Sequence, residues 1–179
     1  MDSWWQRTAQ TVALEFSDFG DVEQATSLLV RLTVAAVLGG LLGIEREQKG
    51  KAAGIRTHMM VAMGSALFVV VSEQAGILAA DMSRVMQGLI AGIGFLGAGT
   101  ILKAQDEEKV KGLTTAAGIW MTAAIGMAAG LGLEVTAVLS TLLALAILSL
   151  MPLLVGLIDK PAKDELATKD NEANNSKST

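Results

Sequence analysis

Hydrophobic residues form five long stretches, and short polar segments separate them. The stretches cover residues 25–44, a segment that begins near Thr57, and residues 85–102, 112–131 and 135–158. A membrane-spanning helix needs roughly 20 mostly apolar residues, which each stretch approaches. The pattern predicts an all-α fold, a polytopic membrane helix bundle with about five transmembrane helices.

The second stretch is the shortest of the five. Its strictly apolar part ends at Val71, so it reaches spanning length only by continuing through Ser72, Glu73 and Gln74 into residues 75–80. The sequence therefore leaves the outer end of this helix open.

Basic residues alternate along the chain. The leader, the four connections and the tail hold 1, 4, 1, 3, 0 and 4 Lys or Arg residues in turn. Short cytoplasmic loops of membrane proteins carry the excess of Lys and Arg. The alternation predicts an outside N-terminus and a cytoplasmic C-terminus.

The two ends of the chain differ from the membrane domain predicted at 25–158. Residues 1–24 begin with an acid and contain Trp4 and Trp5, which indicates an interfacial segment rather than a signal peptide. Asp21 and Gln24 have the spacing of a capping box that would start the first spanning helix. Residues 159–179 are polar and are expected to be a disordered cytoplasmic tail.

Composition narrows the function. The chain of 179 residues has no cysteine, one histidine and a net charge of −4, which argues against thiolate chemistry, most histidine-based sites and nucleic-acid binding. No phosphate-binding loop, zinc-protease motif or activated nucleophile is present. We expect neither an enzyme nor a bound cofactor, and the sequence leaves a metal site unknown.

Glycine is concentrated in the membrane region, with 17 of the 19 glycines between Gly39 and Gly132. Several glycines in the predicted spans stand four residues apart, a spacing that lets helices approach closely in lipid. Examples are Gly39 with Gly43, Gly88 with Gly92, and Gly126 with Gly130. Bundle packing, a dimer face and a hinge all fit this spacing.

The third stretch is the richest in glycine. A dinucleotide-binding reading of its Gly-x-Gly-x-x-Gly string is rejected, because no strand precedes it. A locally unwound or very closely packed helix is expected there instead. The candidate packing or pore-lining residues of this stretch are Gly92, Gly94, Phe95, Gly97 and Gly99.

Charged residues are scarce inside the predicted spans. Arg31 is the intramembrane charge, and it either snorkels to the outer headgroups or pairs with Glu73 or Asp81. The first cytoplasmic loop contains a charged motif that serves either as a membrane anchor with local ion pairs or as a docking site. The residues of this cytoplasmic motif are Glu45, Arg46, Glu47, Arg56 and Thr57.

The fourth stretch opens with Gly112, Thr114 and Thr115, whose hydroxyls can cap the helix or line a polar cavity. Trp120 lies in the middle of this span and is expected to pack against a glycine-flattened helix face. His58, at the inner membrane edge, is interpreted as a solvated or capping residue rather than a proton relay.

Four motifs occur in a familiar order: GIERE at 43–47, AGIRT at 53–57, GIGFLGAGTIL at 92–102 and GLTTAAGIW at 112–120. Together they resemble the MgtC/SapB family of bacterial inner-membrane proteins over roughly 28–132, and more loosely up to residue 158. The virulence-type members carry a C-terminal ACT-like domain. Here 21 polar residues follow the last span, so the chain resembles the shorter SapB or YhiD type.

The resemblance implies a multi-pass protein of the bacterial inner membrane. It also implies a part in adaptation to scarce Mg²⁺ or stress, through restraint of another membrane complex such as the F-type ATP synthase. Besides the lipid bilayer, the expected partner is a membrane protein or a second copy of the chain. The alternative function is transport of Mg²⁺ or another small ion, although the spans lack the carboxylates that would bind it.

Overall fold

The computed structural model describes residues 3–15, 21–102 and 111–151, and within these ranges it is helical and contains no strand. Five helices are long and apolar enough to cross a membrane. They are α2 (Val22–Gln48), α3 (Ile55–Gln74), α4 (Ala79–Leu102), α5 (Leu113–Gly130) and a last helix over Glu134–Met151. The predicted all-α fold with five spans is confirmed, whereas the orientation of the termini stays a prediction.

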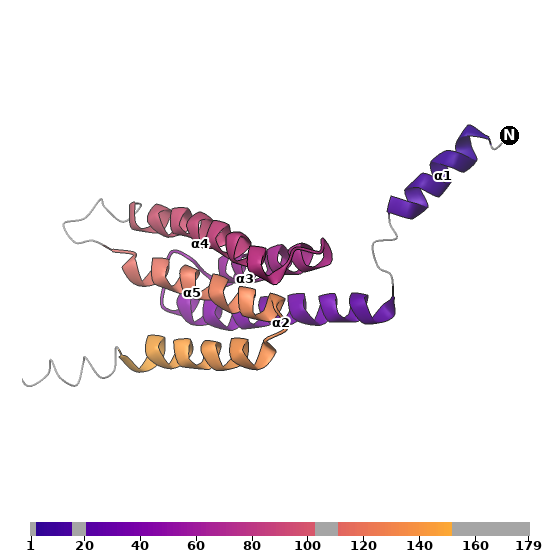
Figure 1. Cartoon of the computed structure of the whole chain (residues 1–179). Helices are drawn as coiled ribbons and strands as arrows, with labels where there is room; N and C mark the ends of the chain where they lie inside the picture. The colour runs from indigo at the N-terminus through magenta and orange to yellow at the C-terminus, as the bar shows by residue number, and fades with distance from the viewer. Residues whose placement is uncertain (1–2, 16–20, 103–110, 152–179) are drawn as a thin grey trace, which may run out of the picture.

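A shorter helix, α1 (Trp4–Glu15), precedes the bundle and lies apart from it (Figure 1). None of its residues is buried, and Trp4 and Trp5 meet edge to face with their ring centres 4.3 Å apart. Exposed tryptophans favour a membrane interface. The interfacial role of residues 1–24 stays a prediction, and the predicted disordered tail at 159–179 lies outside the described residues.

Helix α2 begins where the sequence places its cap. The Asp21 carboxylate accepts a hydrogen bond of 2.9 Å from the backbone N–H of Gln24, which satisfies one of the free donors of the first turn. The helix then continues to Gln48, four residues beyond the predicted apolar stretch at 25–44. The GIERE motif therefore lies on the last turns of α2 and not in a loop.

Helix α3 resolves the open end of the second span. It begins at Ile55, earlier than the apolar pattern indicates, and ends at Gln74. Gly76 then adopts a left-handed φ of +73°, and its N–H bonds to the carbonyl of Glu73. This backbone conformation favours glycine and terminates the helix. The helix therefore does not continue into residues 75–80, where a turn separates α3 from α4, and it reaches spanning length through its earlier start at Ile55.

The core lies between α2, α3 and α5, and the last helix covers one side of it. Its centre is built largely from alanine and leucine, with Leu42 and Ile125 among the largest fully buried side chains. Buried Thr122 and Thr141 direct their hydroxyls to the carbonyls four residues earlier, so neither needs a partner on another helix. The predicted fifth span agrees with the last helix as far as Met151.

Glycines bring these three helices into close contact. A methyl group on Gly39 would lie 2.6 Å from the carbonyl oxygen of His58, and one on Gly43 would lie 2.5 Å from Cα of Ile55. A methyl group on Gly126 would overlap the backbone of Ala62, and one on Gly130 would lie 2.7 Å from the carbonyl oxygen of Ala66. Two of the three predicted glycine pairs thus mediate helix packing within the bundle.

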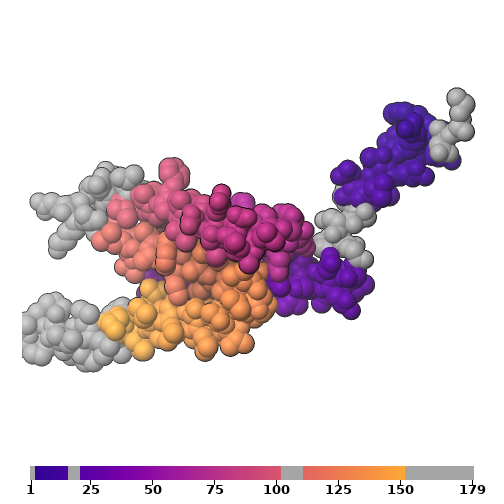
Figure 2. Space-filling model, in the orientation of Figure 1, coloured from indigo at the N-terminus to yellow at the C-terminus, as the bar shows by residue number. Residues whose placement is uncertain are grey.

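Helix α4 is at the edge of the bundle and packs mainly against α5. Its inner side contributes Ile93 to a small second core with Ile119 and Ala123 of α5. Figure 2 shows the atoms of α4, in magenta, on the visible surface with no other described helix over them. Most of its apolar surface is therefore available to lipid or to another protein.

Candidate functional site

Two residues of the predicted charged motif, Glu45 and Arg46, form a compact ion-pair cluster with Lys49 at the C-terminal end of α2. The Glu45 carboxylate pairs with the guanidinium of Arg46 and lies 2.5 Å from Nζ of Lys49. Arg46 is only 2% exposed, and the Glu45 side chain is 11% exposed. A buried charge is costly unless it is paired, so this cluster holds the end of α2 in a defined conformation.

The cluster also joins α2 to its neighbours. Lys49 donates a 2.7 Å hydrogen bond to the carbonyl of Leu148 on the last helix. Glu47 accepts a 2.9 Å hydrogen bond from the N–H of Ile55, at the start of α3, where Gly54 has no capping side chain. Two consecutive spans and the last helix are therefore fixed to one another by Glu47 of the GIERE motif and by Lys49.

The rest of the predicted motif is separate from this cluster. Arg56 and Thr57 are exposed on the first turn of α3 and line a shallow cavity with Glu47. Glu45 and Glu47 have different partners and do not converge. The described residues contain no group of three or more acidic, histidine or cysteine side chains suited to hold a metal ion.

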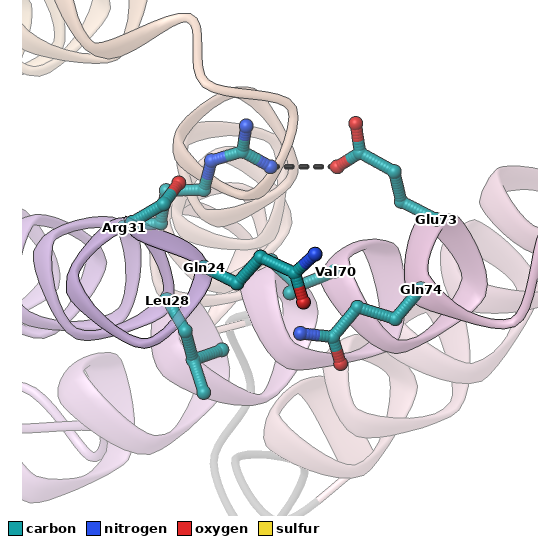
Figure 3. Close-up of a pocket in the computed structure, with 7 residues that line it drawn as sticks. Gln24, Leu28, Arg31, Val70, Glu73 and Gln74 are labelled. Atoms are coloured by element: carbon teal, nitrogen blue, oxygen red, sulfur yellow. Dashed lines mark hydrogen bonds and ion pairs between the residues drawn. The ribbon is translucent and has the colours of Figure 1, made fainter. Parts of the chain in front are cut away.

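A second polar site lies at the opposite end of the bundle, between α2 and α3. Arg31 places a guanidinium nitrogen 2.6 Å from the Glu73 carboxylate, and the same nitrogen donates to the carbonyl of Gly130 at 2.9 Å (Figure 3). Of the two partners expected from the sequence, Glu73 is confirmed, and Asp81 instead pairs with Arg84 at 3.5 Å. Gln24 and Gln74 line the same cavity, whose volume is about 430 Å³.

The contacts of Arg31 lead to a prediction about stability. Replacing Arg31 by Met should lower the free energy of unfolding by about 1–2 kcal/mol, because the bond to the C-terminal carbonyl of α5 is lost. Glu73 is more than half exposed, so Glu73→Gln should cost under about 1 kcal/mol. Denaturant titration in detergent micelles measures both, and an equal effect of the two substitutions would show that the ion pair dominates.

Most glycines of the third stretch lie on the exposed surface of a regular helix. Helix α4 is continuous from Ala79 to Leu102. Methyl groups on Gly92, Gly94 and Gly99 would have no heavy atom within 4 Å among the described residues. Gly97 alone of this group faces α5, with Ala116 Cβ at 3.5 Å. The expectation of a locally unwound or tightly packed α4 is therefore wrong for most of these glycines.

The residues predicted on α5 divide between interior and surface. Gly112 precedes the helix with a φ of +94°, which favours glycine, and a side chain there would also collide with the carbonyl of Thr100. Thr115 is buried, whereas Thr114 is exposed. Trp120 is 50% exposed, and its expected packing against a glycine-flattened helix face stays a prediction. Phe95 of α4, at 80% exposed, also faces outward.

The position of His58 differs from the sequence interpretation. Its side chain is fully buried, and Nδ1 lies 3.0 Å from the carbonyl oxygen of Gly54, one turn earlier. Nε2 is buried and has no hydrogen-bond partner among the described residues. The expectation of a solvated histidine is wrong, because glycines at positions 39 and 118 let α2 and α5 close over it. The one signal in the sequence is that His58 follows Gly54 by four residues, which places its ring one helical turn from the Gly54 carbonyl.

A family model for the MgtC family matches residues 32–156, well over half of the chain. The chain belongs to the MgtC family. The matched region contains the Glu45–Arg46–Lys49 cluster, His58, all of α4 and the last helix, and it begins directly after Arg31.

Several family members align with the same region. "Putative magnesium transporter YhiD" of Escherichia coli (strain K12) is 42% identical over 127 residues, which cover 67% of this chain and 58% of that protein. Protein SrpB of Synechococcus elongatus is 46% identical over 133 residues, 68% of this chain and 73% of SrpB. Protein MgtC of Brucella abortus (strain 2308) is 42% identical over 130 residues, which cover 72% of this chain and 52% of that protein.

The chain thus spans little more than half the length of YhiD and of the Brucella MgtC. No solved structure matches it. Membership of the MgtC family, together with the five apolar helices, establishes a multi-pass membrane protein.

Proposed function

We propose that this MgtC family member is a non-enzymatic regulator that binds another membrane complex through its helices. It lies in the bacterial inner membrane and acts when Mg²⁺ is scarce or the cell is stressed. The F-type ATP synthase is the first complex to test, because the resemblance to the wider MgtC/SapB family implies it.

One observation supports this proposal: one face of α4 is exposed, with no other described helix packed on it. Gly88, Gly92, Phe95 and Gly99 lie at helical spacings of four, three and four residues, and all four are exposed. The glycines leave a shallow surface, and Phe95 projects from it. Within a bilayer such small-residue faces favour close association with another helix. We call these four residues the α4 face.

Transport of Mg²⁺ is the function that the name of YhiD suggests, and a flux measurement distinguishes it from regulation. The full chain is reconstituted into liposomes that contain a Mg²⁺-sensitive dye, and a known Mg²⁺ carrier serves as the positive control. We expect no flux above that of empty liposomes, for Mg²⁺ or for monovalent ions. Flux that rises with the amount of folded chain would contradict the proposal.

A further inference from the structure

The last helix, Glu134–Met151, is packed unevenly along its length. Its buried side chains are Ala137, Thr141 and Ala144, which are small and lie at helical spacings of four and three residues. None of residues 145–151, the final two turns that the structure describes, is buried. Side-chain packing therefore holds the first part of this helix against the bundle and holds its final turns only weakly.

A cavity of about 410 Å³ lies between this weakly packed part and the helices α2 and α5. Ile147 and Leu148 of the last helix line it, together with Leu42 of α2 and Met121 of α5. Atoms that border a gap have no partners on that side, so they lose the dispersion attraction that close packing gives. The gap thus removes much of the packing that would otherwise fix the final turns.

A polar bond from α2 fixes this end of the helix instead. Nζ of Lys49 donates a 2.7 Å hydrogen bond to the carbonyl of Leu148 and lies 2.5 Å from the Glu45 carboxylate. In a continuous helix that carbonyl would accept from the N–H of residue 152, but residue 152 is proline, which has no N–H. Lys49 therefore supplies a donor that the sequence of the last helix lacks, at the C-terminal end where the helix dipole favours a cation.

We propose that Lys49 is a releasable latch on the last helix. In the docked position, which the structure shows, Lys49 caps the helix. In the released position this bond is broken, and residues 145–151 move away from α2 as the helix tilts about its contacts at Ala137 and Thr141. The movement needs no partner, so it goes beyond the proposed contact through α4, and it gives a non-enzymatic protein two states.

The surroundings of Lys49 allow the latch to open. Its side chain is 38% exposed, so water replaces the hydrogen bond that is lost on release. Glu45 pairs with Arg46 in either position, so release leaves no buried charge without a partner. Arg46, at 2% exposed, has no such freedom, which separates a structural residue of the cluster from a releasable one.

The experiment measures distances by pulsed electron paramagnetic resonance on the full chain in lipid nanodiscs. The chain has no cysteine, so spin labels attach only at introduced pairs. Met60→Cys on α3 is combined in turn with Leu139→Cys, Ile147→Cys and Leu150→Cys on the last helix. All four side chains are exposed, so the labels do not have to enter the core.

Lys49→Met removes the donor and should raise the ratio of released to docked molecules about tenfold, which corresponds to one hydrogen bond from a charged group at an exposed site. The distances from Met60 to Ile147 and to Leu150 should both gain this second population, with the larger change at Leu150. The distance from Met60 to Leu139 should stay the same, because Leu139 lies beside the contacts about which the helix tilts.

Lys51→Met is the matched control, because Lys51 is an exposed lysine two residues beyond Lys49. It should leave all three distance distributions as they are in the unchanged chain. Identical distributions in Lys49→Met and Lys51→Met would overturn the proposal.

Two other outcomes would also overturn it. A change at Leu150 without one at Ile147 would mean that the end of the helix unwinds and that the helix does not tilt. A change at Leu139 as large as that at Leu150 would mean that the whole helix leaves the bundle, which contradicts a tilt about Ala137 and Thr141.

Discussion

Gly126→Ala should destabilise the bundle by about 3 kcal/mol, the upper part of the range for overpacking. The new methyl group would overlap the carbonyl oxygen of Ala62 and lie 2.8 Å from its Cα. Backbone atoms cannot change rotamer, so α3 and α5 must move apart and lose packing across the core. The free energy of unfolding, measured by denaturant titration in detergent micelles, reports this loss.

The matched control for this prediction is Gly64→Ala on α3. A methyl group there has no heavy atom within 4 Å in the described chain, so the substitution should be neutral, or stabilising by up to about 1 kcal/mol through helix propensity. Similar losses in the two variants would mean that α3 and α5 do not cross as closely as the structure shows.

Arg46→Met should have the second large effect, a loss of about 3 kcal/mol. Methionine fills much of the space of the aliphatic part of arginine but leaves Glu45, which is 11% exposed, with Lys49 as its remaining cationic partner. Removal of one partner from a buried ion pair typically costs about 3–5 kcal/mol, and Lys49 compensates in part.

Arg56→Met in the neighbouring motif is the control for Arg46→Met. Arg56 is exposed, so its loss should change stability by no more than about 0.5 kcal/mol. Micelle unfolding with the same denaturant compares the two substitutions directly. If Arg56→Met proved as costly as Arg46→Met, the buried cluster would not be the feature that holds the end of α2.

The sequence predicts the spans because hydropathy and length depend on composition alone. It also predicts the Asp21 cap, which needs only local spacing, and it includes Glu73 among the partners of Arg31. The prediction fails where the outcome depends on backbone conformation or on which helix lies alongside. The end of α3, for example, depends on a single left-handed glycine, which hydropathy does not register.

The glycine pairs illustrate why the contacts between helices could not be predicted from the sequence. Gly126 and Gly130 contact α3, whereas methyl groups on Gly88 and Gly92, with the same spacing, would meet no heavy atom of the described chain within 4 Å. Spacing predicts a smooth helix face but does not say which helix covers it. The burial of His58 has the same origin, because it depends on glycines from two other helices.

Gly94→Leu shows how the structure changes a prediction. The closely packed third span expected from the sequence would have no room for a leucine at this position, but a methyl group on Gly94 would meet no heavy atom of the described chain within 4 Å. We now expect the substitution to leave the bundle intact. Since Gly94 lies outside the α4 face, it becomes the control for Gly92→Leu, which would fill that face.

Photo-crosslinking in native membranes tests the central claim most directly. A benzoyl-phenylalanine at position 95 lies on the α4 face, and one at position 93 replaces a side chain packed against α5. We predict an adduct between position 95 and another membrane complex, lost in Gly92→Leu and retained in Gly94→Leu, with none from position 93. Adducts of the chain only with itself, or an adduct insensitive to Gly92→Leu, would contradict a regulator that binds through α4.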